Sequence, residues 1–274
     1  MRAVRLLGPG GVEELSLDDV PIPELAVGEA LVQVHAAAIT RDELEWPVDR
    51  LPAIPSYELS GVVAEVAPDV TEVAVGDAVY ALTPFDRDGA AAEYVAVPAL
   101  LLGAKPGALS HVESAALPMP GLTAWQGLFE HGGLESGQRV VIHGAAGGVG
   151  HVAIQLARER GALVVGADDA IEPVDLVFDT VGGDPLRRSP QLVRTGGRLV
   201  SVAEEPEPSR PDISASYFVV EPDRVQLAEL AGLADAGKLR VDVDSVFPLA
   251  EARAAFERVQ SRGKRGKVVL EVVG

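Results

Sequence analysis

The sequence predicts an α/β fold in which a β-rich part comes first and a doubly wound parallel sheet follows. Residues 1 to about 110 contain short β-branched runs bounded by Gly, Pro or Asp, which predicts a small barrel or sandwich. From about residue 137 onward, strand patterns alternate with helical patterns, an order that is typical of a parallel sheet covered by helices. The chain of 274 residues is long enough for one large domain or two ordinary ones.

Turn and cap signals mark the borders of the elements. Ser110 precedes a short helical pattern and Glu113 follows three residues later, which predicts a capping box. The strands expected in the first part lie at 30–35, 61–66, 78–82 and 91–97. The later elements are expected as strands at 140–142, 162–166, 175–179, 197–202 and 267–273, and as helices at 123–129, 186–193, 223–236 and 248–259.

The composition excludes several classes of function. The net charge of −18 argues against a nucleic acid partner and against an anionic membrane surface, because both need clustered Lys and Arg. The chain has no cysteine, which removes disulfides, thiolate nucleophiles and Cys-based zinc sites. No apolar run approaches the ~18 residues of a membrane span, and no signal peptide is recognised. We therefore expect a cytoplasmic protein with no nucleic acid and no membrane partner.

One glycine turn carries the strongest functional signal. An apolar run at 140–142 leads into Gly144, Gly147 and Gly150, which have the spacing G-x-x-G-x-x-G, and a helical pattern follows. Small residues let backbone N–H groups approach a diphosphate, and the positive N-terminus of the helix favours the anion. The last glycine allows close packing of the helix on the strand. The turn predicts a dinucleotide site, and a glycine-lined turn that binds nothing is the alternative.

Several stretches in the expected order resemble one enzyme family. They lie at 20–29, 52–61, 75–79, 121–124, 145–150, 174–184 and 265–270. The chain resembles the medium-chain dehydrogenase/reductase superfamily, in its zinc-independent quinone oxidoreductase and enoyl reductase branch. The resemblance implies a GroES-like substrate domain at 1–112, completed by 248–274, and a shortened Rossmann nucleotide-binding domain at 113–247.

The resemblance also implies hydride transfer from NADPH or NADH to a small-molecule substrate, which is a quinone, an enone or an enoyl group, and a homodimer. Zinc-dependent relatives carry a Cys near Arg41 and a His before the Glu of the second motif. Here Tyr57 precedes Glu58 and there is no Cys, so no catalytic metal is expected. The residues implied at the cofactor are Thr40, Thr123, Ala146, Gly147, Gly148, Val149, Asp168, Val181, Val202 and Phe218.

The first departure from the family pattern lies at 39–42. The family usually has Asn followed by Pro, and the Asn amide often helps to position the nicotinamide ribose. Thr40 could donate one hydrogen bond there, while Arg41 brings a cation in place of a turn-fixing Pro. That cation either orients an acidic or enolate-forming substrate or points to water.

The second departure is a deletion. Only eight residues, 167–174, separate the second expected strand from Asp175 in the next one. A parallel crossover needs a dozen or more residues, so none fits here. A bare loop does fit, because the path of about 20 Å is within the roughly 27 Å reach of eight extended residues. We predict that one strand of the family sheet and the helices flanking it are absent.

The deleted part normally holds the adenosine end of the cofactor. NADPH needs a cation or hydroxyl after the second strand, whereas NAD uses an acidic residue about 20 positions after the glycine turn begins. Asp168 and Asp169 stand there, which favours NAD if one of them binds the ribose. Alternatively, Asp168 is a turn residue, the ribose site is gone and no cofactor is bound. The loss also uncovers apolar sheet surface, which a partner subunit, the other domain or a ligand must cover.

The candidate catalytic groups are few. Tyr57 offers a phenol suited to protonate an enolate, and a Tyr packed into the cleft wall is the alternative. Arg41 and Asp42 complete the expected set, and Asp42 could equally be structural. Three functions stay open: a nicotinamide-dependent oxidoreductase, a redox-inactive relative that works as a cyclase or lyase in a small-molecule biosynthetic pathway, and a non-catalytic binding protein.

Overall fold

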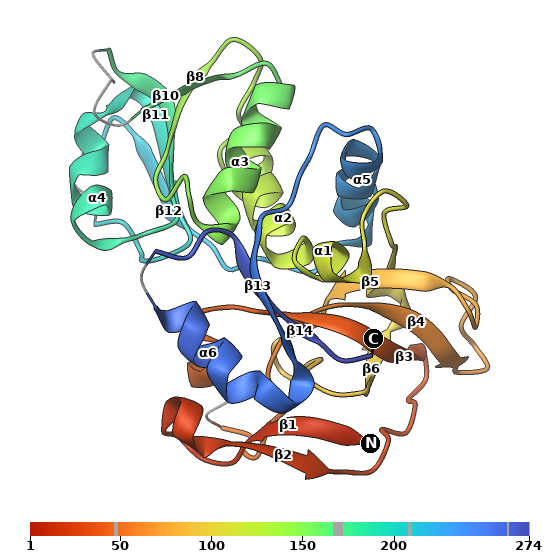
Figure 1. Cartoon of the computed structure of the whole chain (residues 1–274). Helices are drawn as coiled ribbons and strands as arrows, with labels where there is room; N and C mark the ends of the chain where they lie inside the picture. The colour runs from red at the N-terminus through yellow and green to blue at the C-terminus, as the bar shows by residue number, and fades with distance from the viewer. Residues whose placement is uncertain (47–48, 167–171, 208–209, 262, 274) are drawn as a thin grey trace. The chain divides into compact units, whose positions relative to one another are not determined.

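The computed structural model describes residues 1–46, 49–166, 172–207, 210–261 and 263–273 (Figure 1). The chain forms two compact units, and the second is inserted into the first. The first unit consists of Met1–Pro118, Pro222–Gly237 and Val241–Gly274, and the second of Met119–Glu221 and Lys238–Arg240. This division differs from the predicted domain borders, because residues 113–118, 222–237 and 241–247 belong to the first unit.

The first unit is built on a mainly antiparallel sheet. Among the described residues its seven strands follow the order β13-β14-β3-β4-β5-β7, with β6 paired to β3. They are β3 (Glu29–Ile39), β4 (Glu58–Val66), β5 (Ala78–Leu82), β6 (Tyr94–Pro98), β7 (Gly103–Ala104), β13 (Val243–Pro248) and β14 (Lys267–Glu271). A separate antiparallel hairpin joins β1 (Arg2–Leu6) to β2 (Leu15–Asp19).

Short helices cover this sheet. Helix α1 (His111–Ala115) packs on β3 and β4, α5 (Arg224–Asp235) on β7, and α6 (Ala252–Gln260) on β13 and β14. Four single 3-10 turns lie at Gly11–Glu14, Glu43–Glu45, Ala99–Leu101 and Leu249–Glu251. The amphipathic helix α6 buries Ala255, Phe256 and Val259 in a core shared with β1 and β14. Full burial of a side chain such as Phe256 stabilises the fold by about 1.5–3 kcal/mol.

The second unit is a doubly wound parallel sheet. Its five strands among the described residues follow the order β12-β11-β10-β8-β9, and every pair is parallel. They are β8 (Arg139–Ile142), β9 (Leu163–Val165), β10 (Val174–Asp179), β11 (Val193–Ser201) and β12 (Ser214–Tyr217). The helices are α2 (Pro118–Trp125), a π-helix (Gln126–His131), α3 (Gly148–Glu159), α4 (Gly183–Arg188) and a 3-10 turn (Ser189–Gln191).

The deletion leaves β9 at the edge of this sheet. Strands β9 and β10 pair with opposite sides of β8, and no described strand pairs with the outer side of β9. Residues 167–171, which join β9 to β10, lie outside the described residues, so the missing strand stays a prediction. Strand β9 is only three residues long and its Leu163 is 58% exposed. Apolar side-chain surface is therefore open at this edge.

Two local expectations have different outcomes. The capping box is confirmed, because the Ser110 side chain accepts from the backbone N–H of Glu113 at 3.2 Å and the reciprocal bond is also present. The helix expected at 186–193 is wrong, since α4 already ends at Arg188 and β11 begins at Val193. Pro190 has no N–H to continue the helical ladder, and the chain there forms a 3-10 turn.

Candidate functional site

The first candidate site lies at the carboxyl edge of the parallel sheet in the second unit. Strand β8 continues through α3 to β9 on one side, while β10 and β11 lie on the other side. The strand order therefore reverses between β8 and β10. In open α/β sheets, ligands bind outside the carboxyl ends of the strands at such a reversal.

The glycine turn connects β8 to α3 at this reversal. Gly144 has a φ of +78°, a conformation that favours glycine, and Gly147 N donates to Gly144 O at 2.8 Å. Gly147 is the N-cap of α3, and a Cβ at Gly150 would lie 2.1 Å from Gly144 O. The backbone of the turn and the first turn of α3 are thus held close together. The four predicted residues 146–149 all lie here, at a helix N-terminus suited to a phosphate.

A second loop follows β10 and carries Val181, whose side chain is 52% exposed. Its geometry depends on Asp179, the buried last residue of β10. The Oδ2 of Asp179 accepts from Gly182 N and from Ser201 Oγ, each at 2.9 Å. Thr180 Oγ1 donates to His143 O at 2.8 Å, which joins this loop to the end of β8.

A third loop begins at Val202, immediately after β11. Val202 N donates to Asp179 O at 3.1 Å, and Ser201 Oγ accepts from Glu204 N at 3.3 Å. Glu204 Oε1 in turn accepts from Gly183 N at 3.0 Å. The loops that carry the two predicted valines are therefore cross-linked. The sequence analysis missed these linking residues, although an Asp at the end of a buried strand before two glycines is a usable signal.

The two remaining predicted residues of this unit are buried. Phe218, just after β12, is 7% exposed and its ring stacks on His131 with centroids 4.2 Å apart. Thr123 in α2 is 5% exposed. Both side chains thus belong to the packed interior of the unit. Asp168 lies outside the described residues.

Cations near β8 lie at the other edge of the sheet. Arg139 begins β8 and donates to Glu172 Oε2 at 2.8 Å. Arg194, at the start of β11, donates to Asp175 Oδ1 at 2.6 Å. These guanidinium groups are paired with carboxylates near the amino ends of their strands.

The second candidate site lies in the first unit, where β3 ends. Thr40 is half-buried and follows β3 directly. Lys267 Nζ donates to Thr40 Oγ1 at 3.0 Å, and Lys267 also forms an ion pair with Glu58. The Lys267 and Glu58 side chains are 7% and 1% exposed. A buried charge pair therefore stands directly behind the Thr40 hydroxyl, which donates to Glu58 Oε1 at 3.4 Å.

A second buried carboxyl group, that of Glu43, binds the backbone on both sides of this charge pair. Its Oε2 accepts from Thr40 N at 2.9 Å and its Oε1 from Ser56 N at 3.1 Å. Burial raises the pKa of Glu43 to about 8, against the opposing effects of the Thr40 N–H and the Lys267 cation. Ser56 has a φ of +69°, and its Oγ donates to Ala38 O at 2.8 Å. These bonds hold a strained residue directly before Tyr57.

Tyr57 lies in a closed aromatic group with Trp46 and Phe85, at ring-centroid distances of 5.6 and 5.4 Å. The side chain is 0% exposed, and its hydroxyl accepts from Arg50 at 2.7 Å. Burial raises the pKa of Tyr57 above its usual value, while the Arg50 cation opposes this. The phenol is therefore neutral at pH 7 and out of contact with water.

The other two predicted catalytic residues lie at the surface. Arg41 donates to Gln260 O, at the end of α6, at 3.3 Å. Arg41 and Asp42 line a cavity of about 600 Å³ together with Leu44 and Glu45. The contacts found for the described residues join neither of them to Tyr57. The structure thus places the three predicted catalytic residues in two different environments.

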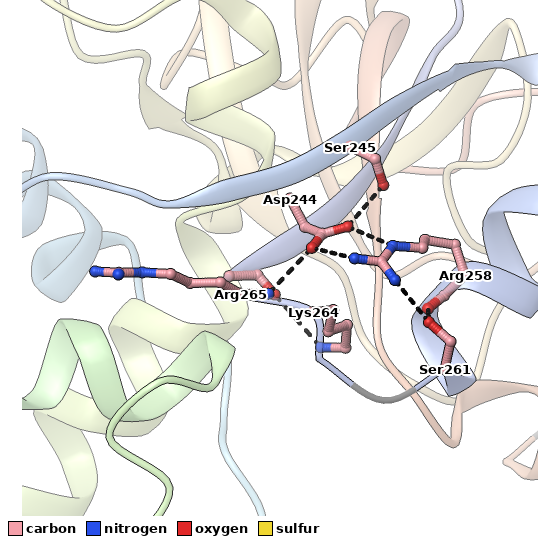
Figure 2. Close-up of polar contacts among 7 residues, drawn as sticks. Asp244, Ser245, Arg258, Ser261, Lys264 and Arg265 are labelled. Carbon is pink, nitrogen blue, oxygen red and sulfur yellow. Dashed lines mark hydrogen bonds and ion pairs between the residues drawn. The ribbon is translucent and has the colours of Figure 1, made fainter.

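The segment that leads to Lys267 is fixed by Asp244 (Figure 2). Asp244 accepts two bonds of 2.7 Å from the guanidinium of Arg258 and one of 3.0 Å from Arg265 N. The Arg258 bonds lower the pKa of Asp244 to about 2. This carboxylate links β13, α6 and the segment directly before β14, whose first residue is Lys267.

Two general findings concern the described residues only. No group of three or more His, Cys, Asp or Glu side chains is placed to hold a metal ion. No helix within these residues combines the length and the hydropathy needed to span a membrane.

Comparisons with known proteins cover nearly the whole chain. Models described as alcohol dehydrogenase GroES-like domain and zinc-binding dehydrogenase match residues 26–107 and 151–270. A probable mitochondrial zinc-binding oxidoreductase of Arthroderma benhamiae is 32% identical, over 99% of this chain and 97% of the relative. A 2-methylene-furan-3-one reductase of Solanum lycopersicum is 29% identical, over 100% of this chain and 79% of the relative.

A solved structure agrees with these matches. The quinone oxidoreductase from Coxiella burnetii superposes with a TM-score of 0.92 at 30% identity, covering 100% of this chain and 99% of that chain. The alignment with the Arthroderma protein extends over 321 residues, although this chain has 274. The relative therefore carries residues that have no counterpart here, as expected for a deletion.

Proposed function

The chain belongs to the medium-chain dehydrogenase/reductase superfamily and is an oxidoreductase of that family, and we propose that it reduces quinones, enones or enoyl groups with a reduced nicotinamide cofactor. The observation that carries this proposal is the glycine turn at the N-terminus of α3, where the strand order reverses. The names of the tomato reductase and the Coxiella quinone oxidoreductase support the substrate class.

The residues of the second unit fit part of the cofactor. The turn around Gly147 presents backbone to a phosphate, and a Cβ at Gly150 would close it. We assign Val181 and Val202 to the neighbouring part of the cofactor, because Asp179 links both of their loops. Thr123 and Phe218 are buried, so their predicted contact with the cofactor stays a proposal. When bound, the cofactor supplies the hydride from its dihydronicotinamide ring.

The first unit supplies a polarised hydroxyl. Thr40 is half-buried, and its oxygen accepts from the buried Lys267 cation at 3.0 Å. A hydroxyl that accepts from a cation becomes a stronger donor toward a third group. We assign Thr40 the task of donating a hydrogen bond either to the substrate carbonyl as negative charge develops or to the nicotinamide ribose. For this task its single hydroxyl hydrogen must turn away from Glu58 Oε1, which it meets at the long distance of 3.4 Å. Glu58 neutralises Lys267, so that no net charge is buried by this pair.

A conservative substitution separates these two roles. Thr40→Val removes the hydroxyl at nearly constant volume. If Thr40 stabilises the developing enolate, kcat falls about 10–100-fold while the Kd of the cofactor changes little. If it binds the ribose, the Kd of the cofactor rises instead. Thr40→Ser, which keeps the hydroxyl, is the matched control and retains most of the lost function.

The three predicted catalytic groups stay proposals of unequal support. Complete burial and the Arg50 bond favour Tyr57 as a wall residue, so the role of proton donor requires the phenol to become accessible. Arg41 is exposed beside a cavity and can attract an acidic substrate. Asp42 lines the same cavity and opposes an anion there. Tyr57→Phe distinguishes the first two cases, because a wall residue tolerates loss of the hydroxyl.

We propose that catalysis needs no zinc, although the descriptions of one matching family model and of the Arthroderma relative name zinc. Tyr57 stands where zinc-dependent relatives have a histidine, and its hydroxyl is engaged with Arg50. The chain offers no thiolate, and no step of the proposed reaction passes through a metal. A homodimer is also proposed, supported by the open edge strand β12 with exposed Tyr217. A cytoplasmic location stays a prediction.

The proposed function is tested by titration and turnover. We expect NADH or NADPH to bind with a Kd below about 1 mM, which corresponds to about 4 kcal/mol. Reduced nicotinamide absorbance should then fall on addition of a benzoquinone or a 2-alkenal. Binding without turnover on either class would remove the assigned substrates. Absence of binding would remove the proposed function itself.

One observation favours a second function. The sheet lacks a strand on the β9 side in the described residues, and that side normally supports the cofactor. We therefore keep the redox-inactive cyclase or lyase as the alternative. It predicts that no nicotinamide cofactor binds, and it assigns the acid–base chemistry to Tyr57, Arg41 and Asp42.

A further inference from the structure

We infer that this enzyme binds its cofactor through the nicotinamide mononucleotide half alone, so that reduced nicotinamide mononucleotide (NMNH) serves as well as NADH or NADPH. The inference rests on the proposed function, because it requires that a reduced nicotinamide binds at the glycine turn. It concerns which chemical part of the cofactor the protein recognises. Two independent observations carry it, one from topology and one from charge.

The topological observation is the position of β9. In a doubly wound sheet, the adenosine lies across the strands that follow the glycine turn and its helix. Here β9 pairs only with β8 among the described strands, spans Leu163–Val165 and exposes more than half of Leu163. The chain then needs only eight residues to reach Val174 and Asp175 of β10. The described residues thus provide no strand beyond β9 on which an adenosine could rest.

The charge observation concerns the described loops at the carboxyl edge of the sheet. The segments 143–150, 180–183 and 202–207 contain no Lys and no Arg. They contain Glu204, Glu205 and Glu207. A 2′-phosphate needs a cation or hydroxyl donors, and carboxylates repel it. The described loops at this edge therefore offer a 2′-phosphate no cation.

Arginines elsewhere in this unit do not compensate. Arg139 donates to Glu172 at 2.8 Å from the first residue of β8, and Arg194 donates to Asp175 at 2.6 Å from the start of β11. Both lie toward the amino ends of parallel strands and already have carboxylate partners. Neither of these two guanidinium groups is therefore placed to pair with the 2′-phosphate of NADPH.

The mononucleotide half keeps its contacts. NMNH carries one 5′-phosphate, which suits the N-terminus of α3 at Gly147 and Gly148. The loops of Val181 and Val202 are cross-linked through Asp179. These features lie on the β10 side of the turn, which the deletion does not touch. Affinity is thus concentrated in the part of the cofactor that carries the hydride.

The test compares dissociation constants by calorimetry on the full-length protein. We expect NMNH, NADH and NADPH to bind within about fivefold of one another, and adenosine 2′,5′-bisphosphate to give no heat at millimolar concentration. Gly150→Ala weakens all three nicotinamides to a similar extent. Leu163→Ser, at the edge where adenosine would otherwise pack, leaves all three unchanged.

Failure of the inference is distinct from failure of the proposed function. If NADH or NADPH binds more than about tenfold tighter than NMNH, the adenosine end is recognised and the inference is overturned while the reductase assignment stands. Measurable binding of adenosine 2′,5′-bisphosphate overturns it in the same way. If none of the three nicotinamides binds, both the inference and the proposed function fall.

Discussion

In the second unit, β8 pairs with a parallel strand on each side, but the two sides differ in how many strands and hydrogen bonds follow. On one side, β10, β11 and β12 extend the sheet, and Asp179 and Ser201 tie their loops together. On the other side lies β9 alone, three residues long, with Leu163 exposed. The polar cross-links thus occur on the side to which we assign the nicotinamide half of the cofactor. The comparison teaches that a parallel sheet can end in a short, exposed strand on one side while the loops on its other side stay cross-linked.

The largest effect is expected at the turn that both sides share. In Gly150→Ala, the new Cβ would meet Gly144 O at 2.1 Å and would force α3 away from the turn. We expect the affinity for every nicotinamide to fall about 100-fold, or about 2.7 kcal/mol, because the phosphate site is lost. The free energy of unfolding should fall by about 1–3 kcal/mol through overpacking. Calorimetry and urea unfolding measure the two quantities.

Gly232→Ala is the matched control, because the same methyl group meets nothing within 4 Å in the exposed part of α5. It should leave binding unchanged and stabilise the protein by about 0.5–1 kcal/mol. Equal binding by Gly150→Ala and the parent protein would show that the turn holds no phosphate. The assignment of the cofactor phosphate to the glycine turn would then be wrong.

A smaller effect is expected on the cross-linked side. Asp179→Ala leaves Gly182 N and Ser201 Oγ without their shared acceptor. We expect the free energy of unfolding to fall by about 1–3 kcal/mol. Nicotinamide affinity should fall about tenfold as the loop of Val181 loosens. Asp179→Asn keeps one oxygen and should lose less of both, whereas equal losses in the two variants would contradict the assigned contact.

The first unit supplies a reference that is independent of both sides of β8. Burial raises the pKa of Glu43 from 4.5 to about 8. Between pH 4.5 and about pH 8 the folded protein keeps a proton on Glu43 that the unfolded chain has released. The contribution of Glu43 to stability is therefore fully present below pH 4.5 and is lost as pH rises through about 8. In Glu43→Gln, urea unfolding across the window should show a flatter dependence on pH, and an unchanged slope would show that Glu43 is ionised throughout.

The smallest effect is expected at the edge. Leu163 is 58% exposed and lies in a three-residue strand. Leu163→Ser should change the free energy of unfolding by less than about 0.5 kcal/mol, as is usual for surface positions. A loss of several times that size, or a concentration-dependent loss, would show that a partner subunit covers β9. Urea unfolding at two protein concentrations distinguishes these outcomes.

The sequence predicts the fold well where the signals are local or countable. Alternating strands and helices predict the parallel sheet, and a count of eight residues predicts the missing strand. The count works because a helical crossover has a minimum length. The unit borders are less predictable, since α5 (Arg224–Asp235) continues from the second unit in sequence but packs on β7 of the first. Nothing in the periodicity of a helix says which sheet will cover its apolar face.

The candidate site is predicted only in part. Motif spacing identifies residues 146–149, because a phosphate-binding turn is made by consecutive backbone groups. Tyr57 is found by position, but its burial by Trp46 and its bond to Arg50 come from long-range packing that spacing does not encode. The Lys267–Thr40 bond joins residues 227 positions apart. Contacts of this kind become visible only once the strands β3 and β14 are known to pair.

The central claim is that this protein binds the nicotinamide end of its cofactor and makes little contact with the adenosine end. Saturation-transfer NMR on NADH bound to the full chain tests it most directly, because each proton reports its own proximity to the protein. We predict strong transfer to the nicotinamide protons and little transfer to the adenine protons. Equal transfer to both rings would contradict the account.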